Sequence, residues 1–282
     1  MAIGLIGCIP FPLLYLFSDG LRFITKHLLR YRVSVIKQNL AYVFPDKDQH
    51  QRDLIFHEFY KNFIDIILES IKGQSYSPEK LIDRFRLKNP ELLEAAHENG
   101  QHVIAYSHHY NNWEWGPVCL GLQIDHHITG IVKLIANPLI NNYMIDQRSR
   151  ANVSVVQTGH TGKFMSKLPE STRPICIVFI ADQRPSGNNK KVKLPFLGSE
   201  AFFHKGAGIY AAQLKAPIYT IDVHRVSRGR YEVELVPIVN KNEDLSPEDI
   251  SERYKAHLED LILKSPESWL WSHKRFKEFL KY

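Results

Sequence analysis

The spacing of apolar residues in the first third of the chain is that of an α-helix. Over residues 48–72, apolar and aromatic side chains recur at intervals of three and four, which places them on one helix face. They are Phe56, Phe59, Tyr60, Phe63, Ile67 and Ile71. This pattern predicts a long helix whose aromatic stripe packs against a core. A second helix start is predicted at Ser77-Pro78-Glu79, with serine as cap and proline in the first turn.

Beyond residue 100, short apolar runs alternate with helical patterns. Strands are predicted at 103–106, 127–134, 153–157, 175–181, 217–223 and 231–237. Helices are predicted at 90–98, 113–122, 138–149, 204–215 and 247–264. This alternation is typical of an α/β fold with a mainly parallel central sheet flanked by helices. Binding sites in such sheets lie beyond the carboxyl ends of strands, which favours the polar clusters at 107–114 and 182–190 over the basic stretch near 224–230.

The N-terminus has a different character. Residues 1–18 carry no charge and are mostly apolar, but a spanning helix needs about 20 such residues, and Pro10 and Pro12 interrupt the run. Basic and apolar residues then mix up to Lys37, as in segments that lie on a membrane surface. We therefore predict that residues 1–32 form a helical membrane-associating segment with its basic side in the cytoplasm, and that residues 33–282 form one domain. The alternative is that residues 1–32 pack onto that domain as an ordinary helix.

Composition narrows the class of partner only slightly. The 282 residues carry a net charge of +6, which favours an anionic partner such as a phospholipid headgroup, a phosphorylated substrate or nucleic acid. The basic residues are scattered and no recognition motif is present, so we do not expect nucleic-acid binding. The three cysteines, Cys8, Cys119 and Cys176, have neither metal-ligand spacing nor the pattern of a disulfide framework, which indicates a reducing compartment.

Candidate chemistry begins directly after the predicted strand at 103–106, where His108 and His109 are followed by Glu114. A carboxylate beside an imidazole raises its basicity and fixes its tautomer, so that the other ring nitrogen can accept a proton from a hydroxyl. The predicted helix start nearby would offer backbone N–H groups to a developing oxyanion or a phosphate. The pattern suggests His109 as a general base oriented by Glu114, although this spacing alone is common by chance.

Four further segments extend the pattern along the chain. The stretch from His109 to Glu114 resembles the His-x4-(Asp/Glu) motif of glycerolipid and lipid A acyltransferases. The later segments are Asn137-Pro138-Leu139-Ile140 with Gln147-Arg148-Ser149-Arg150, Ala181-Asp182-Gln183, Pro195-Phe196-Leu197-Gly198, and the C-terminal run from Trp269 to Lys277. In this order, over residues 20–278, they resemble the lipid A biosynthesis (lauroyl/myristoyl) acyltransferases of the lysophospholipid-acyltransferase-like superfamily.

The resemblance implies acyl transfer from an acyl carrier protein thioester to a hydroxyl of a lipid A precursor, at the cytoplasmic face of the cell inner membrane, with no cofactor and no metal. It implies that residues 33–282 are the catalytic domain, with His109 as base and Glu114 as its partner. It also implies substrate contacts for Arg148, Arg150, Asp182 and Gln183. His108 lies one position too early for the motif and is interpreted as structural support.

The acceptor stays open, because the chain departs from the family pattern in two places. It reads Asp182-Gln183-Arg184-Pro185 where some lipid A enzymes have Asp-His-Asp, and its N-terminal apolar segment is short. A lysophospholipid, an amino-acid lipid or a pigment-type lipid are alternative acceptors. The absence of a Glu-Gly-Thr-Arg block argues against the glycerol-phosphate branch.

Plainer interpretations exist for several of these residues. Asp182 can cap a turn, Arg148 and Arg150 can form a solvated helix end, and Trp269 and Trp271 are expected in the core. The basic residues of the run 273–277 could meet anionic headgroups or belong to a charged helix start.

A metal site built from His108, His109, His126 and His127 is a rival class of function. It is disfavoured because zinc commonly takes four ligands, often cysteines, and because neighbours on a strand point to opposite faces.

Overall fold

The computed structural model describes residues 6–149, 151–185, 191–240, 243 and 245–282. At its centre is a seven-stranded sheet with the order β1-β9-β8-β2-β5-β3-β4. The strands are β1 Phe85–Leu87, β2 Val103–Ser107, β3 His127–Val132, β4 Val153–Gln157, β5 Ile175–Ile180, β8 Ile218–Ser227 and β9 Arg230–Val239. Neighbouring strands run parallel except β8 and β9, which are antiparallel. The predicted mainly parallel α/β sheet is therefore confirmed.

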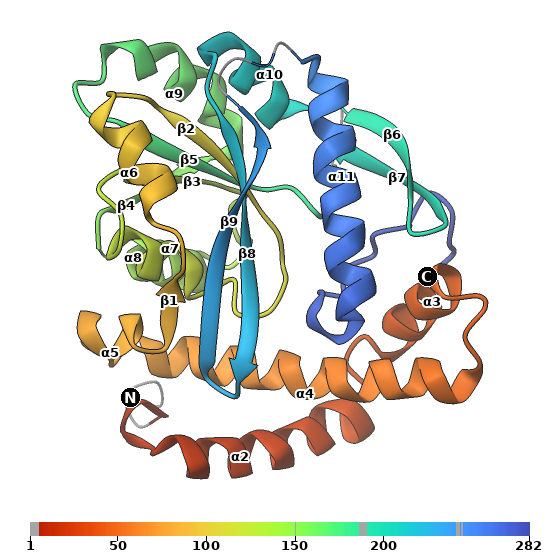
Figure 1. Cartoon of the computed structure of the whole chain (residues 1–282). Helices are drawn as coiled ribbons and strands as arrows, with labels where there is room; N and C mark the ends of the chain where they lie inside the picture. The colour runs from red at the N-terminus through yellow and green to blue at the C-terminus, as the bar shows by residue number, and fades with distance from the viewer. Residues whose placement is uncertain (1–5, 150, 186–190, 241–242, 244) are drawn as a thin grey trace.

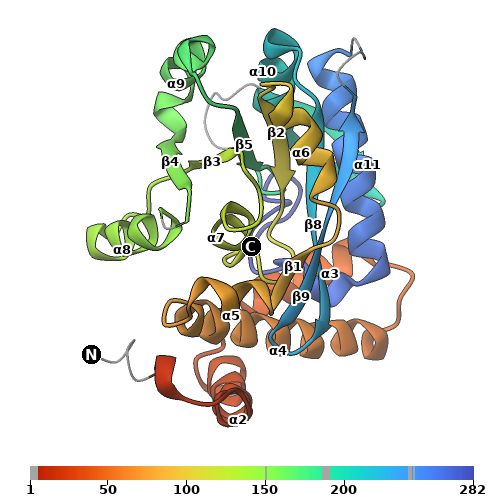
Figure 2. The same ribbon diagram turned by 60° about the vertical axis from the view of Figure 1, so that its left-hand side comes forward.

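Helices flank the sheet, as Figures 1 and 2 show. They are α2 Phe11–Phe23, continued by the π-helical turn η1 Ile24–Leu28, α3 Val33–Val43, α4 Gln49–Gly73, α5 Pro78–Ile82, α6 Glu91–Glu98, α7 Gly116–Gly121, α8 Pro138–Arg148, α9 Thr161–Lys167, α10 Gly206–Leu214 and α11 Pro247–Lys264. Short 3-10 turns lie at η2 Thr158–His160, η3 Leu168–Glu170 and η4 Pro266–Ser268. Helix α11 and the hairpin β6–β7 lie on one side of the sheet (Figure 1), and α7 and α8 lie toward the other (Figure 2).

Strand β2 shows that both faces of the sheet are buried by other elements. Because successive side chains of a strand point to opposite faces, Ile104 and Tyr106 enter the core beside α11, and Val103 and Ala105 enter the core beside α7. All four side chains are at most 1% exposed. Tyr106 stacks on Tyr254 of α11, with ring centroids 4.2 Å apart. A strand buried on both faces has no polar alternation, which explains its continuous apolar run.

Two strands outside the main sheet were not predicted. Strands β6 Lys191–Phe196 and β7 Ser199–His204 form an antiparallel hairpin. The turn between them consists of Leu197 and Gly198, whose φ angles of 53° and 72° lie in the left-handed region that two-residue hairpin turns require. Strand β1 was also missed, because its three residues are too short to show a period.

Two helix predictions were wrong in this part of the chain. Helix α7 begins at Gly116 rather than near residue 113, with proline in its first turn, so Glu114 lies in the turn before the helix. Residues 273–277, for which a charged helix start was one explanation, lie in bends and turns instead. The long helix was predicted well: α4 begins after a capping box in which Asp48 accepts from the Gln51 N–H, one of the strongest helix-start signals in a sequence.

The N-terminal helix α2 lies along α4 at the lower end of the molecule in Figure 1. Its inner face buries Leu14 and Ser18, and the Ser18 hydroxyl donates to Asp65 of α4 at 2.6 Å. The guanidinium of Arg228, from the turn between β8 and β9, donates to both Asp19 and Asp65. The segment thus packs onto the domain partly through an ionic network of Asp19, Arg228 and the buried Asp65.

The outer face of this segment is apolar. Leu13, Leu16, Phe17 and Phe23 of α2 are 57%, 71%, 52% and 61% exposed. Ile24 and Leu28 of η1, and Leu29 after it, are also exposed. Among the residues that the structure describes, which begin at residue 6 of this segment, no helix is both long enough and apolar enough to cross a membrane. The predicted association with a membrane stays a prediction.

Candidate active site

The two polar clusters that the sequence favoured meet at one edge of the sheet. Strands β2 and β5 are parallel neighbours, with Ser107 paired to Ile180 at their carboxyl ends. His109 lies two residues beyond Ser107, and Asp182 lies two residues beyond Ile180. The register therefore brings these two side chains together although 73 positions separate them in the chain. The polar residues that follow these two strand ends are thus neighbours, at the edge where binding sites of parallel sheets commonly lie.

Asp182 is the carboxylate partner of His109. The His109 Nδ1–H donates to Asp182 Oδ1 at 2.8 Å, and the backbone N–H of His109 donates to Oδ2 at 3.0 Å. Burial alone would raise the pKa of Asp182, but the His109 ring and these hydrogen bonds hold that pKa well below its usual range. The ionised Asp182 fixes the proton on Nδ1, so Nε2 of the partly exposed imidazole can accept a proton.

Gln183 lies against the same ring. Its amide nitrogen is 3.2 Å from His109 Nε2 and 3.3 Å from Nδ1. Since Nδ1 already donates to Asp182, the amide can donate only to Nε2. The nearly equal distances place the amide against the ring face, beside the nitrogen that a substrate hydroxyl would use as its base.

The C-terminal segment closes the site from a third direction. The Leu270 N–H donates to the His109 carbonyl at 3.0 Å, and the Trp269 indole N–H donates to Asp182 Oδ2 at 2.9 Å. The side chains of Trp269 and Trp271 are buried in the main core, as predicted. The hydrogen bond from Trp269 to Asp182 was not predicted, because nothing in a sequence shows where an indole N–H points.

Glu114 does not have the partner that was predicted for it. Both of its carboxylate oxygens accept from Nη2 of Arg148, at 3.1 and 3.0 Å, and Oε1 also accepts from the Trp113 indole. The expected pairing of Glu114 with His109 is therefore wrong in this structure, because Asp182 takes the imidazole and Arg148 takes Glu114. Glu114 stays near the site through Trp113, whose ring meets the His109 ring edge-on with centroids 5.3 Å apart.

The loop between His109 and Glu114 is fixed by two asparagines. Asn111 adopts a left-handed conformation with φ of 49°, and its side chain donates to the Val223 carbonyl at 2.6 Å. Asn112 donates to Glu69 Oε2 at 3.0 Å and accepts from the Trp115 N–H at 3.1 Å. Asparagine tolerates this backbone region better than other residues with side chains. The loop is thus fixed by hydrogen bonds to α4, through Asn112, and to β8, through Asn111.

Glu69 is a buried carboxylate that the sequence reasoning missed. Besides Asn112, the hydroxyl of Tyr231 donates to it at 2.6 Å and the hydroxyl of Tyr15 at 2.9 Å. Burial raises its pKa, although the tyrosine hydrogen bonds act in the opposite direction. Through this one side chain, the loop beside His109 is connected to the N-terminal helix.

An apolar cavity of about 230 Å³ adjoins Trp113 and Glu114. Its walls come from α4, from α7 and from the side of α8, and they include Ile67, Val118 and Met144. Among the described residues of its lining, Glu114 and Arg148 are the only charged ones, and they pair with each other. A narrow apolar space of this kind suits a hydrocarbon chain better than a polar ligand.

Comparison with known proteins identifies the family. The sequence profile of the family described as bacterial lipid A biosynthesis acyltransferase matches residues 1–278. The chain belongs to this family. It is 21% identical over 275 residues to the lipid A biosynthesis acyltransferase of Haemophilus influenzae, with 96% of this chain and 86% of the relative covered.

Two Escherichia coli proteins are also similar in sequence to this lipid A acyltransferase. The lipid A biosynthesis lauroyltransferase is 23% identical over 279 residues, which cover 95% of this chain and 87% of the relative. The lipid A biosynthesis palmitoleoyltransferase is 20% identical over 271 residues, which cover 95% and 86%. The family identifies the chain as an acyltransferase that acts on lipid A, as the resemblance implied.

Within this lipid A acyltransferase, the structure describes five of the six predicted site residues. His109, Asp182 and Gln183 are in contact, and Glu114 and Arg148 form an adjoining pair. Arg150 lies outside the described residues. The alternative reading of Arg148 as a solvated helix end is wrong, because its side chain is 20% exposed and lines the apolar cavity.

The second histidine of the motif has a different environment. His108 is fully buried, its Nε2 lies 3.5 Å from Asp222 Oδ1, and its ring lies beside Tyr254. Burial lowers its pKa, so it is neutral at physiological pH. This environment fits the interpretation of His108 as structural support.

The rival metal-site reading can be compared with the same structure. His126 contacts the Gln101 carbonyl, and His127 contacts Asn152 and Ser154, so neither ring lies with His108 or His109. In the part of the chain that the structure describes, no group of three or more His, Cys, Asp and Glu side chains could hold a metal ion.

Proposed function

We propose that this acyltransferase moves a fatty acyl chain from an acyl carrier protein thioester to a hydroxyl of a lipid A precursor, with His109 as general base and Asp182 as the residue that positions it. The observation that carries the proposal is the His109–Asp182 pair beside an apolar cavity. Family membership supports acyl transfer onto lipid A. The carboxylate-bonded imidazole supports hydroxyl activation.

The reaction needs one base and no protein nucleophile. The acceptor hydroxyl gives its proton to His109 Nε2 as its oxygen attacks the thioester carbonyl. Asp182 stabilises the imidazolium that forms, as the carboxylate does in a Ser-His-Asp triad. When the tetrahedral intermediate collapses, the C–S bond breaks, and the leaving thiol of the carrier takes the proton back from Nε2. The products are the new ester and the free thiol, and His109 is neutral again.

The apolar cavity is the proposed site of the acyl chain. Trp113 lines it and contacts the His109 ring, so we expect a chain that fills the cavity to place its carbonyl carbon near Nε2. Arg148 and Glu114 line the same cavity as a neutral pair, which costs less in an apolar pocket than a single charge. We assign to the Arg148 guanidinium the carbonyl oxygen of the thioester, where negative charge develops in the transition state.

The N-terminal segment is proposed to lie on the cytoplasmic surface of the inner membrane. Its exposed residues, from Leu13 to Leu29, form an apolar face opposite the face packed on α4. Arg22 and Arg30 lie in the same segment, and cations beside an apolar face favour a surface with anionic lipids. A lipid acceptor would then reach the site without leaving the bilayer completely.

A matched pair of variants tests the proposal. His109→Ala should lose roughly 10²–10⁴ of the rate, the range of general-base help, in transfer from acyl carrier protein to a lipid A precursor. His50→Ala, an exposed histidine in the first turn of α4, is the control and should keep full activity. Wild-type turnover by His109→Ala would refute the proposed base.

The acceptor needs a separate measurement. A lysophospholipid, an amino-acid lipid or a pigment-type lipid would fit the same base and the same acyl cavity. Mass spectrometry of lipids from a strain without the gene decides between them. Loss of one acyl chain from lipid A supports the proposed acceptor, and fully acylated lipid A would point to one of the others.

A further inference from the structure

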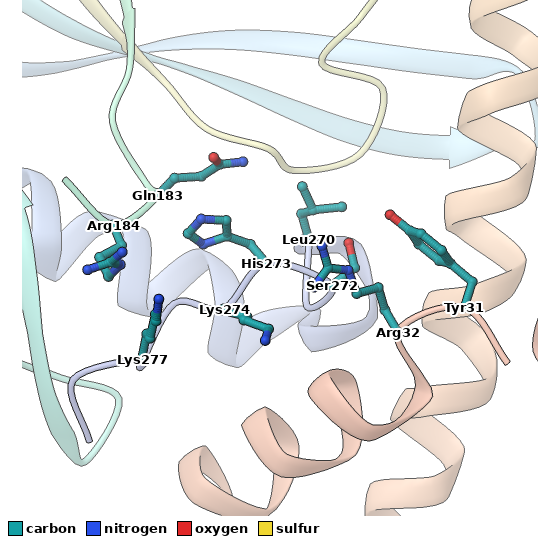
Figure 3. A pocket seen from close by; sticks show the side chains of 9 residues that line it. All are labelled: Tyr31, Arg32, Gln183, Arg184, Leu270, Ser272, His273, Lys274 and Lys277. Atoms are coloured by element: carbon teal, nitrogen blue, oxygen red, sulfur yellow. The ribbon is translucent and has the colours of Figure 1, made fainter. Parts of the chain in front are cut away.

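A second cavity, of about 390 Å³ (Figure 3), is lined in part by Gln183, which contacts the candidate base. It is bounded by the start of α3, the residues after Asp182 and the C-terminal segment. Among the described residues, its lining contains the cationic side chains of Arg32, Arg184, Lys274 and Lys277 together with His273, and no aspartate or glutamate. A cavity with several cations and no anion in its wall favours a negatively charged ligand.

Most of this positive charge is not neutralised by the protein. Arg184 donates to Glu278 at 2.6 Å. Within the described residues, Arg32, Lys274 and Lys277 take part in no ion pair, and Lys274 instead lies over the Tyr282 ring, 5.4 Å from its centroid. Three unpaired cations around one space repel one another, so an anion that enters it gains their combined attraction.

His273 adds a neutral group to the same wall. Burial lowers its pKa to about 4, since nearby Asp182 offsets only part of that effect. Its Nδ1 is buried and has no hydrogen-bond partner among the described residues. Figure 3 shows the His273 ring between Gln183 and the lysines. A buried polar atom without a partner is unusual in a folded protein, and a ligand oxygen or hydroxyl in the cavity would satisfy it.

The cavity begins at the candidate base. Gln183 lines it and also places its amide nitrogen 3.2 Å from His109 Nε2. Leu270 lines it too, and its backbone N–H donates to the His109 carbonyl. A ligand held in this cavity would therefore have its nearest groups beside Nε2, whereas the apolar cavity approaches His109 from Trp113.

The cavity wall is held in place before any ligand binds. The Asn39 side chain of α3 donates to the Trp271 carbonyl at 2.8 Å and to the His273 carbonyl at 2.9 Å. Arg32 immediately precedes α3 in a left-handed conformation with φ of 54°. Two sides of the cavity are thus joined through one buried side chain, and a wall fixed in this way loses little entropy on binding.

From these observations we propose that the basic cavity binds a phosphate group of the acyl acceptor and thereby holds the acceptor hydroxyl at His109. The inference rests on the proposed function, because it assumes that an acceptor hydroxyl is activated there. A phosphate on the prosthetic arm of the donor has the same chemistry, and the experiment must distinguish the two sources. We favour the acceptor, since the acyl chain of the donor is assigned to the other cavity, the one lined by Trp113.

The test uses the full-length Lys274→Gln/Lys277→Gln variant. Acyl transfer is measured with a phosphorylated lipid A precursor and with the same lipid after removal of its phosphates, each varied at saturating donor. The KM for the phosphorylated acceptor should rise by roughly tenfold per lost charge-assisted contact, with kcat within a few-fold. The KM for the dephosphorylated acceptor should not change, and neither should the KM for the donor.

Lys61→Gln/Lys88→Gln is the matched control. These lysines pair with Glu58 and Glu232 and are not among the residues that line the cavity. Replacing both removes the same net charge. The control should keep both KM values, which separates a local site from general attraction to an anionic membrane. An equal rise in KM for both acceptors, or a rise in the KM of the donor, would overturn the inference.

A binding measurement separates failure of this site from failure of the proposed function. Inorganic pyrophosphate is titrated calorimetrically into the wild-type protein and into both double variants. Binding that is retained in the control and lost in Lys274→Gln/Lys277→Gln supports the anion site even if no acyl transfer is detected. If wild type takes up no pyrophosphate, or if the cavity variant binds it equally well, the inference is wrong.

Discussion

Replacing Asp182 by asparagine tests which carboxylate serves the candidate base. Three N–H groups converge on Asp182: Nδ1 and the backbone N–H of His109, and the Trp269 indole. Asparagine offers one acceptor oxygen and one NH₂ group. If its oxygen kept Nδ1, two donors would face the NH₂ group, so the favoured arrangement turns the oxygen toward those two donors.

The NH₂ group of the Asp182→Asn variant would then donate to Nδ1 of His109. This hydrogen bond requires the proton to move to Nε2, and a protonated Nε2 cannot accept a hydroxyl proton. We therefore expect kcat to fall on the order of 10⁴-fold, the size reported by the equivalent change in a Ser-His-Asp triad. The KM for acyl donor and acceptor should stay within a few-fold, because no contact assigned to substrate is removed.

Steady-state acyl transfer is the assay, with two control variants. Glu114→Gln weakens the pair with Arg148 and should raise the KM of the acyl donor more than it lowers kcat. Asp222→Asn changes a carboxylate that is only 2% exposed and is bonded to His257, so it controls for the loss of a buried charge. If Glu114→Gln lost more kcat than Asp182→Asn, Glu114 would be the true partner of His109 and the reasoning would fail.

Stability should depend on pH in opposite directions at two buried carboxylates. The pKa of Asp182 is lowered on folding, so its contribution is complete above the unfolded pKa of about 4. The advantage of wild type over Asp182→Asn should therefore shrink below that pH. The pKa of Glu69 is raised, so the advantage of wild type over Glu69→Gln should shrink as pH rises above about 4. Urea unfolding across pH measures both, and a parallel trend would contradict one assignment. Gly121→Ala should destabilise the folded protein by about 1–3 kcal/mol in the same urea assay, because the added Cβ would lie 2.0 Å from the Ala151 carbonyl oxygen. An unchanged unfolding midpoint would mean that the backbone around this contact relaxes without cost. Asp48→Ala should cost about 0.5–2 kcal/mol by loss of the α4 cap, seen as a lower melting temperature, and an unaltered value would show that packing alone holds this helix end.

The strands and long helices were predictable because their signals are local. The aromatic stripe of residues 48–72 and the apolar run at 103–106 each depend on neighbours within a few residues, and both gave element positions within one or two residues of those found. The hairpin β6–β7 was missed for the same reason. Its turn needs positive φ at Leu197, and leucine gives no sign of that conformation.

The partner of His109 could be inferred only in part. The sequence placed His109 and Asp182 after two strands, but the strand order β2-β5 is needed to make them neighbours. Glu114 was chosen as partner because it is close in sequence, and the turn before α7 directs it to Arg148 instead. Proximity along the chain is thus a poor guide to pairing at a sheet edge, where register decides which side chains meet.

The topology also explains why two different cavities flank one histidine. After β2 the chain leaves through α7, whose apolar residues enter the core on one face of the sheet. After β5 it leaves through the hairpin and α10, whose buried residues enter the core on the other face. Connections that diverge to opposite faces from neighbouring parallel strands leave a crevice beyond the strand ends.

His109 and Asp182 lie at that crevice, and the C-terminal segment covers it. The side toward α7 is bounded by apolar helix faces, and the side toward the C-terminal segment by its basic residues. A reaction that joins an apolar acyl group to a polar acceptor needs an apolar and a polar binding region near the same base. In this fold, the two regions differ in polarity because the connections after β2 and β5 leave the sheet toward opposite faces.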